Sequence, residues 1–115
     1  MQTFTLDAKN KKVGRLASEA AKLLMGKNTV EYTRNNIPDV KVAIVNASKA
    51  DVSAKRKKSE VHPRYTRYPS GLIIETVGRV IEVKGYKELF RKAVYGMLPG
   101  NKLRAQMMKH LTISE

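Results

Sequence analysis

Apolar residues recur along this chain with two periods, one typical of strands and one typical of helices. Residues 3–6 alternate polar and apolar, which predicts a short first strand. Residues 14–25 repeat apolar positions at the 3.6-residue period of a helix. The positions expected to face the core are Leu16, Ala20, Leu23 and Leu24. Gly26 suits the end of that helix, so strand, turn and helix together indicate a βα unit.

The middle of the chain predicts a second strand. Residues 40–45 are almost wholly apolar, as is typical of a central strand that is covered on both faces. The polar stretch 28–39 connects the first helix to it. Residues 47–51 are expected to form a short helical turn, and Val52 with the basic run behind it a further strand and loop.

Residues 72–83 fit two descriptions. Their β-branched start favours a strand, whereas the spacing of Val77, Val80 and Ile81 fits a helix that begins after Thr76. Both alternatives stay open at this point.

The last third of the chain predicts two helices. Residues 86–97 form the clearer one, with Glu88 and Lys92 placed for an i,i+4 ion pair. Its expected buried positions are Leu89, Phe90, Ala93, Val94 and Met97. Asn101 is expected to cap the second helix, whose inward positions would be Leu103, Met107, Met108 and Leu111. The methionines at helical spacing are expected in the core.

Strands alternating with helices predict a small α/β sandwich with a mostly parallel sheet. At 115 residues the chain has the size of one domain, residues 1–115, and can build its own core. It has no cysteine, which excludes disulfides and thiol chemistry and makes the cytoplasm the expected compartment. No apolar run approaches the roughly 18 residues of a membrane span.

The net charge of the chain indicates what kind of partner it binds. Twenty-three Lys and Arg against ten Asp and Glu leave a net charge of +13 and a pI near 10.2. Such a surplus opposes the isolated fold through self-repulsion, and counterion release on binding a nucleic acid would offset it. If about eight cations touch phosphates, log K should fall with log salt at a slope of roughly −6 to −7.

The cations form three groups. The most informative is the basic loop 55–71, where four adjacent cations repel one another and tyrosines stand beside arginines, a combination that suits phosphates, sugars and bases. Its candidate RNA-binding residues are Lys55, Arg56, Lys57, Lys58, Arg64, Tyr65, Arg67 and Tyr68. The first strand-to-helix turn adds Lys11, Lys12 and Arg15. The third group lies on the last two helices and contains Lys87 together with the candidate RNA-binding residues Arg91, Lys92, Lys102, Arg104 and Lys109.

Catalysis is not supported. Residues 26–29 lack the earlier glycine of a phosphate loop and follow a helix rather than open one. His62 and His110 have no carboxylate at metal-ligand spacing, and each is expected to be a phosphate or surface residue. No serine lies in a nucleophile elbow, and the acids are scattered. We therefore expect no enzyme, cofactor, metal or small-molecule substrate.

Several motifs, in order along the chain, resemble the bacterial-type large-subunit ribosomal protein thirteen (L-thirteen) family. They are Asp7-Ala8, residues 13–18 (VGRLAS), Gly26-Lys27, Asn46-Ala47, residues 68–72 (YPSGL) and residues 93–99 (AVYGMLP) with Asn101 and Leu103. The resemblance spans nearly the whole chain. It implies a three-layer α/β/α sandwich around a mainly parallel sheet, and partners that are large-subunit rRNA and neighbouring ribosomal proteins.

The sequence also departs from the family pattern. Phe4 stands where relatives commonly have tryptophan, and Ser70 replaces the first glycine of a YPGG-like turn. Residues 64–67 and 101–105 differ from the family's motifs as well, which affects the RNA contacts that can be carried over.

The expected function is a structural constituent of the large ribosomal subunit that binds rRNA and supports assembly and translation. Alternatives are a free RNA- or DNA-binding regulator, a small nucleotide enzyme and a scaffold with protein partners only.

Overall fold

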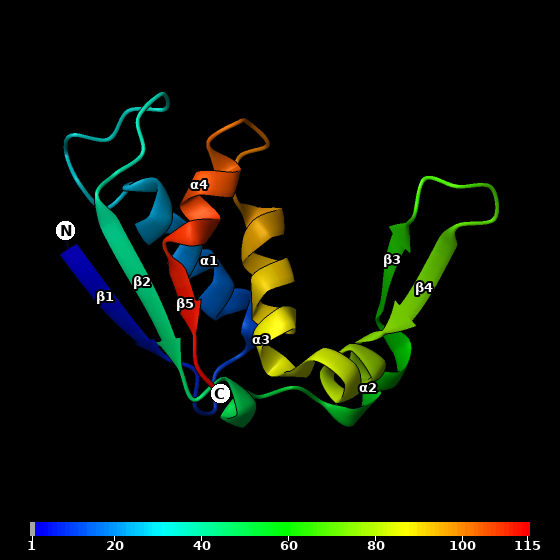
Figure 1. Ribbon diagram of the computed structural model, residues 1–115. Helices are drawn as coiled ribbons and strands as arrows, with labels where there is room; N and C mark the ends of the chain where they lie inside the picture. The colour runs from blue at the N-terminus through cyan, green and yellow to red at the C-terminus, as the bar shows by residue number, and fades with distance from the viewer. Residues whose placement is uncertain (1) are drawn as a thin grey trace.

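The computed structural model describes residues 2–115 and contains a three-stranded parallel sheet. Strands β1 (Gln2–Asp7), β2 (Val40–Val45) and β5 (Leu111–Ile113) lie in the order β1-β2-β5 (Figure 1). Ile44 of β2 is aligned with Leu6 on one side and Ile113 on the other, so apolar side chains form rows across the sheet. The α/β class and the mainly parallel sheet are therefore confirmed.

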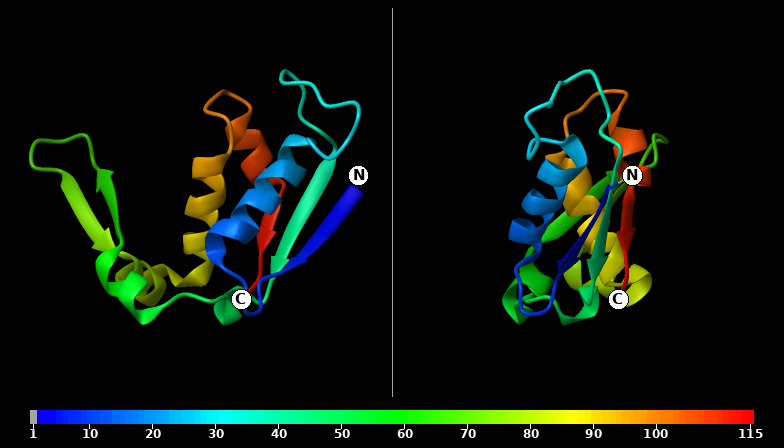
Figure 2. Two further views of the ribbon diagram at one scale, coloured as in Figure 1. Left: turned by 180° about the vertical axis from the view of Figure 1, so that it is seen from behind. Right: turned by 90° about the vertical axis from the view of Figure 1, so that its left-hand side faces the viewer.

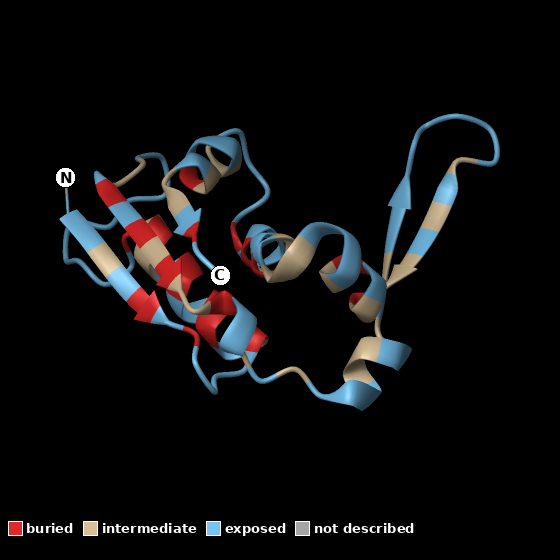
Figure 3. Ribbon diagram, turned by 60° about the horizontal axis from the view of Figure 1, so that its bottom comes forward, coloured by how far each residue is buried: buried red, intermediate tan, exposed pale blue. Residues whose placement is uncertain are grey.

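Helices cover one face of this sheet. Helix α1 (Val13–Met25) and helix α3 (Val77–Met97) lie on the same side of it, and both helices carry buried residues, as the strands do (Figure 3). Leu16, Ala20 and Leu24 are buried as their spacing predicts, and Gly26 ends α1 in the left-handed conformation with φ of 78°. The βα unit expected at the start of the chain is confirmed.

The opposite face of the sheet is largely open. Lys41 is exposed and Val45 is half-buried, although strand 40–45 was expected to be covered on both faces. That expectation is wrong because no helix among residues 2–115 packs on this side (Figure 2). The Cα atoms extend over 43 × 37 × 17 Å. The shortest extent, 17 Å, fits a sheet that is covered by a single layer of helices, each about 10 Å in diameter. A third layer stays a prediction.

An arm extends from this body. Helix α2 (Ala54–Ser59) leads into an antiparallel hairpin of β3 (Val61–Tyr65) and β4 (Leu72–Thr76), which projects beyond α3 in Figure 1. The radius of gyration, 15.1 Å, exceeds the roughly 13 Å of a compact chain of this size. Residues 55–71 are therefore mostly helix and strand, and only the tip of the hairpin is a loop.

The two alternatives for residues 72–83 are each correct for one half. The β-branched start is strand β4, which ends at Thr76. The Thr76 side chain then accepts a hydrogen bond from the Arg79 N–H at 3.3 Å and caps α3. Val77 and Val80 are buried on the first turns of this helix, as the helical spacing predicts.

Gly85 breaks α3 in the middle. Its φ of 80° and ψ of 176° are not helical, so residues 77–84 and 86–97 form two helical pieces. The Glu115 side chain lies against this break and accepts a hydrogen bond from the Lys87 N–H at 3.1 Å, at the start of the second piece. A helix boundary predicted near residue 86 thus corresponds to a real break.

Gly85→Ala is expected to lower the free energy of unfolding by about 1–2 kcal/mol, because a side chain at positive φ is strained and its Cβ would meet the Glu115 carboxylate. Urea denaturation followed by circular dichroism measures the loss. Gly96→Ala is the matched control, since Gly96 lies in the regular part of the same helix with open space around it. An equal or smaller loss at Gly85 would contradict the account.

Three predictions about the C-terminal region are wrong. Leu111 does not belong to the last helix: α4 spans only Arg104–Lys109, and Leu111 pairs with Val42 in the sheet. Met97 was expected in the core but is 40% exposed, whereas Met107 is buried. Asn101 lies before α4 rather than at its cap, and its side chain accepts from the Leu103 N–H at 3.0 Å.

Candidate nucleic-acid interface

The predicted RNA-binding residues fall into three surface clusters, which we name by their place in the fold. The turn cluster comprises Lys11, Lys12 and Arg15. The arm cluster comprises Lys55, Arg56, Lys57, Lys58, Arg64, Tyr65, Arg67 and Tyr68. The α3–α4 cluster comprises Arg91, Lys92, Lys102, Arg104 and Lys109. Most of these side chains are exposed, and only Arg56, Lys57, Lys92 and Arg104 are half-buried.

The turn cluster lies between β1 and α1, and the fold brings an acid from elsewhere to it. Asp51 donates its backbone N–H to the Lys11 carbonyl at 2.9 Å, and its carboxylate lies 2.6 Å from the Lys12 ammonium. Lys12 is therefore already paired. Lys11 and Arg15 form no ion pair within residues 2–115, so both can bind an external anion.

The four adjacent cations of residues 55–58 form most of helix α2 despite their mutual repulsion. Ser53 begins the helix by accepting the Arg56 N–H at 3.2 Å, and Arg56 forms an i,i+4 ion pair with Glu60 at its end. The Arg56 guanidinium lowers the pKa of the Glu60 carboxyl through hydrogen bonding, and Glu60 in turn raises the pKa of Arg56. Arg56 is thus paired with an acid at the end of its own helix.

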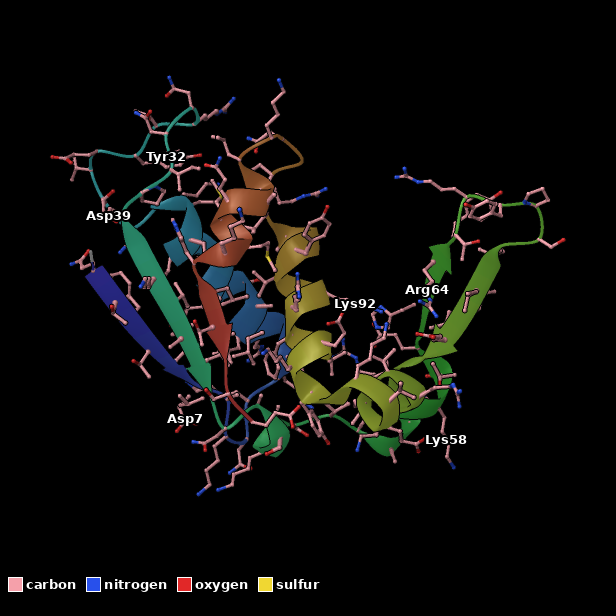
Figure 4. The ribbon with its side chains drawn as sticks, in the orientation of Figure 1. Asp7, Tyr32, Asp39, Lys58, Arg64 and Lys92 are labelled. Atoms are coloured by element: carbon pink, nitrogen blue, oxygen red, sulfur yellow. The ribbon has the colours of Figure 1, made fainter. Side chains whose placement is uncertain are left out.

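Helix geometry separates the remaining cations of α2. The Lys57 ammonium points back to the body, 3.5 Å from the Tyr86 hydroxyl and 5.9 Å from the centre of its ring. Lys55 and Lys58 are exposed and unpaired within the described chain, and Figure 4 shows Lys58 directed away from the body. Two of the four adjacent cations are therefore free for a phosphate partner.

The hairpin uses its own acid in the same way. Arg64 on β3 lies 3.1 Å from the Glu75 carboxylate on β4, whose side chain is only 15% exposed. Figure 4 places Arg64 on the side of the hairpin that faces α3. His62 is also turned inward, with a buried Nε2 atom that has no hydrogen-bond partner in the described residues, so the expectation of a phosphate or surface histidine is wrong there.

The tip of the hairpin presents Arg67 and Tyr68 to solvent. Arg67 has a φ of 69°, which is uncommon for a side chain with a Cβ, and Tyr68 is 73% exposed. The loop is closed by the Thr66 N–H donating to the Gly71 carbonyl at 3.0 Å and the Gly71 N–H donating to the Tyr68 carbonyl at 2.9 Å. A side chain at residue 71 would collide with Thr66, which explains the glycine.

In the α3–α4 cluster, Arg104 is held by a tyrosine rather than an acid. Its guanidinium lies 3.8 Å from the centre of the Tyr95 ring and donates to the Tyr95 hydroxyl at 2.7 Å. Arg91, Lys102 and Lys109 are exposed. Lys92 lies on the side of α3 that is turned toward the arm (Figure 4), and the expected ion pair with Glu88 does not form.

Most of the intramolecular partners of these cations cannot be found from the sequence. Asp51, Glu75 and Tyr86 lie far along the chain from the cations they contact, and no local pattern links them. Only Glu60 could have been found, because it follows Arg56 at the i,i+4 spacing of a helix.

Within residues 2–115, no three side chains of His, Asp or Glu are grouped closely enough to hold a metal ion. None of the described helices is both long and apolar enough to span a bilayer. The described surface therefore presents exposed cations and tyrosines in the turn, arm and α3–α4 clusters.

Comparison with known proteins gives a consistent result. The family described as Ribosomal protein L13 matches residues 1–115. The large ribosomal subunit protein uL13 of Geobacter sulfurreducens is 38% identical over 110 residues, covering 96% of this chain and 76% of that protein. For uL13 of Carboxydothermus hydrogenoformans the identity is 39%, with coverages of 96% and 76%. For uL13 of Synechococcus sp. it is 36%, with coverages of 97% and 74%.

Proposed function

Because this chain belongs to the ribosomal protein L13 family, we propose that it is a structural constituent of the large ribosomal subunit that binds large-subunit rRNA and supports assembly and translation. The observation that carries the proposal is the family match over residues 1–115. The role is structural rather than enzymatic. The partners are rRNA and neighbouring large-subunit proteins, and the location is the large subunit in the cytoplasm.

The free cations are the proposed phosphate contacts. Lys12, Arg56 and Arg64 have acidic partners within the chain, and an RNA phosphate would have to displace them. Eight further exposed cations of the clusters have no such partner among residues 2–115. They are Lys11, Arg15, Lys55, Lys58, Arg67, Arg91, Lys102 and Lys109. Eight contacts correspond to a salt slope of roughly −6 to −7.

Tyrosines and shape complete the proposed interface. Tyr65 and Tyr68 are 60% and 73% exposed on the arm, where they can stack on or hydrogen-bond to nucleotides. Residues 1–115 act as one ribosomal-protein domain in this proposal. Its three-layer α/β/α form also remains part of the proposal, and the third layer would lie on the open sheet face that carries Lys41.

Sedimentation of a cell lysate tests the function. The protein should pellet with large subunits at about one copy each, and it should leave them only when salt strips rRNA-bound proteins. Recovery mainly in the ribosome-free fraction would favour a free RNA- or DNA-binding regulator instead.

Glu60→Gln is expected to strengthen rRNA binding, because it releases Arg56 from its intrahelical ion pair. One added phosphate contact should steepen the salt slope by about 0.7–0.9 and raise affinity roughly 6-fold at 0.1 M salt. Filter binding across a salt series measures both quantities.

The double change Glu60→Gln with Arg56→Ala serves as control and should return the slope to the wild-type value. If Glu60→Gln alone left the slope unchanged, Arg56 would not lie near phosphate even when it is released.

A further inference from the structure

A groove of about 590 Å³ lies between α3, α4 and β5. Its rim carries the cations Lys87, Arg91 and Lys109, and no acidic side chain lines it. Its apolar lining, which we call the floor, consists of Ala105, Met108, Leu111 and Ile113, and Thr112 also lines the groove. The volume is within the roughly 300–1,000 Å³ range of ligand sites, so it can take a group larger than a single ion.

The rim cations are available to a ligand. Lys87, Arg91 and Lys109 are exposed, and none forms an ion pair within the described residues. Lys87 and Arg91 are one helical turn apart on α3, and Lys109 comes from the end of α4. Three unpaired cations around an apolar floor favour a ligand that is anionic at its edge and apolar at its centre.

Tyr95 forms a wall of the groove in an ordered position. Tyr95 is 46% exposed, yet the Arg104 guanidinium lies 3.8 Å from the centre of its ring and donates to its hydroxyl at 2.7 Å. Tyr95 also lines a second hollow together with Glu88, Arg91 and Lys92. A ring that is already fixed loses little conformational entropy when a flat group packs against it.

A nucleotide with an unpaired base has this combination of properties. Its base presents flat apolar faces, whereas its two flanking phosphates are anionic. Double-stranded RNA exposes phosphates and ribose but keeps its base faces in the stack, so it cannot fill an apolar floor. Arg104, which contacts Tyr95, adds a further cation beside the groove.

We propose that this groove binds one unpaired nucleotide of the RNA partner, with its base on the apolar floor beside Tyr95 and its flanking phosphates on Lys87, Arg91 and Lys109. The proposal rests on the RNA-binding function above and specifies which RNA conformation one surface selects. In this proposal the α3–α4 surface recognises a single-stranded nucleotide, in addition to the nucleotide contacts proposed for Tyr65 and Tyr68 on the arm, whereas the turn cluster contributes charge alone.

Binding of two RNA probes to the full chain tests this assignment. The first is a single-stranded heptanucleotide with 2-aminopurine at its centre, and the second is a blunt duplex of the same length. Wild-type protein should quench the fluorescence of the first probe on stacking and bind it more tightly than the duplex.

Two variants distinguish binding in the groove from binding through the overall charge of the protein. Tyr95→Ala removes the wall, and Ala105→Phe fills the floor from an exposed position on α4 without altering any charge.

Each variant should weaken binding of the single-stranded probe about 5- to 150-fold, the range of one aromatic–base stack. Ala105→Phe should also leave the salt slope unchanged, because it neither adds nor releases a cation. Tyr32→Ala is the matched control, because Tyr32 also lies beneath a cation, with the Lys27 ammonium 5.9 Å from its ring centre, but lines no part of this groove. It should bind both probes like wild type.

The outcomes are distinguishable. A steep salt slope with rRNA but wild-type binding of the heptanucleotide by both groove variants would overturn the groove assignment and leave the proposed function intact. Stronger displacement of the probe by an acidic, leucine-containing peptide than by unlabelled heptanucleotide would assign the groove to a protein partner and also overturn it. A flat salt slope with rRNA would reject the proposed function itself.

Discussion

Phe90→Ala is expected to lower the free energy of unfolding by about 3–5 kcal/mol, the usual cost of truncating a buried aromatic side chain. Phe90 is the largest fully buried side chain, with 0% exposure, and belongs to the core that α3 forms with α1 and the sheet. A domain of this size has only about 5–15 kcal/mol in total, and the net charge of +13 reduces the margin further. The midpoint of thermal unfolding should fall by roughly 12–25 °C.

Met97→Ala on the same helix is the control for Phe90→Ala. Met97 is 40% exposed, so its truncation leaves no cavity and should cost less than about 1 kcal/mol. Differential scanning calorimetry of both variants compares the two positions directly. A similar loss at residues 90 and 97 would show that the second half of α3 is packed differently from the structure described.

Lys55→Ala combined with Lys58→Ala is expected to weaken rRNA binding about 40-fold at 0.1 M salt and to flatten the salt slope by about 1.4–1.8, because two phosphate contacts are lost. These two side chains are the exposed, unpaired cations of α2, whereas Arg56 is paired with Glu60 and Lys57 contacts Tyr86. Changing all four cations of residues 55–58 to Ala should therefore flatten the salt slope by less than twice as much as the double change. Filter binding between 50 and 300 mM salt is the measurement.

The matched control removes the same net charge elsewhere. Lys22 on α1 and Lys41 on the open sheet face are exposed and belong to no cluster. Lys22→Ala with Lys41→Ala should leave the slope almost unchanged if specific contacts on the arm matter more than total charge. Equal losses in the two double variants would mean that RNA senses only the net charge of the molecule.

Local patterns predicted the elements whose stability comes from one continuous apolar face. The spacing of Leu16, Ala20 and Leu24 located α1, and that of Leu89, Phe90 and Val94 located the second half of α3. These predictions succeeded because every turn of such a helix repeats the same burial, so the signal extends over many residues. The last strand, Leu111–Ile113, was missed because three residues carry no period and its pairing partner lies far along the chain.

The basic run 55–58 shows why a structural prediction from charge alone was wrong. Four adjacent cations suggested a loop, yet Ser53 and Glu60 at the two ends of the run stabilise a helix by a cap and an ion pair. The hairpin that follows depends on Val61 pairing with Thr76, fifteen residues later, which neither strand indicates alone. Likewise the number of free cations depends on Asp51 and Glu75, which only the folded chain brings close.

The amino-acid sequence by itself determined the class of the molecule, the surplus of cations and the family, because composition, period and motif are properties of neighbouring residues. Only the tertiary structure decided which cations remain free for RNA, that residues 54–76 form an arm, and that Tyr95 stands over an apolar groove. The physical reason is distance. An ion pair or a groove depends on separations of a few ångströms between residues that are remote along the chain, and these separations are defined only after the core has packed.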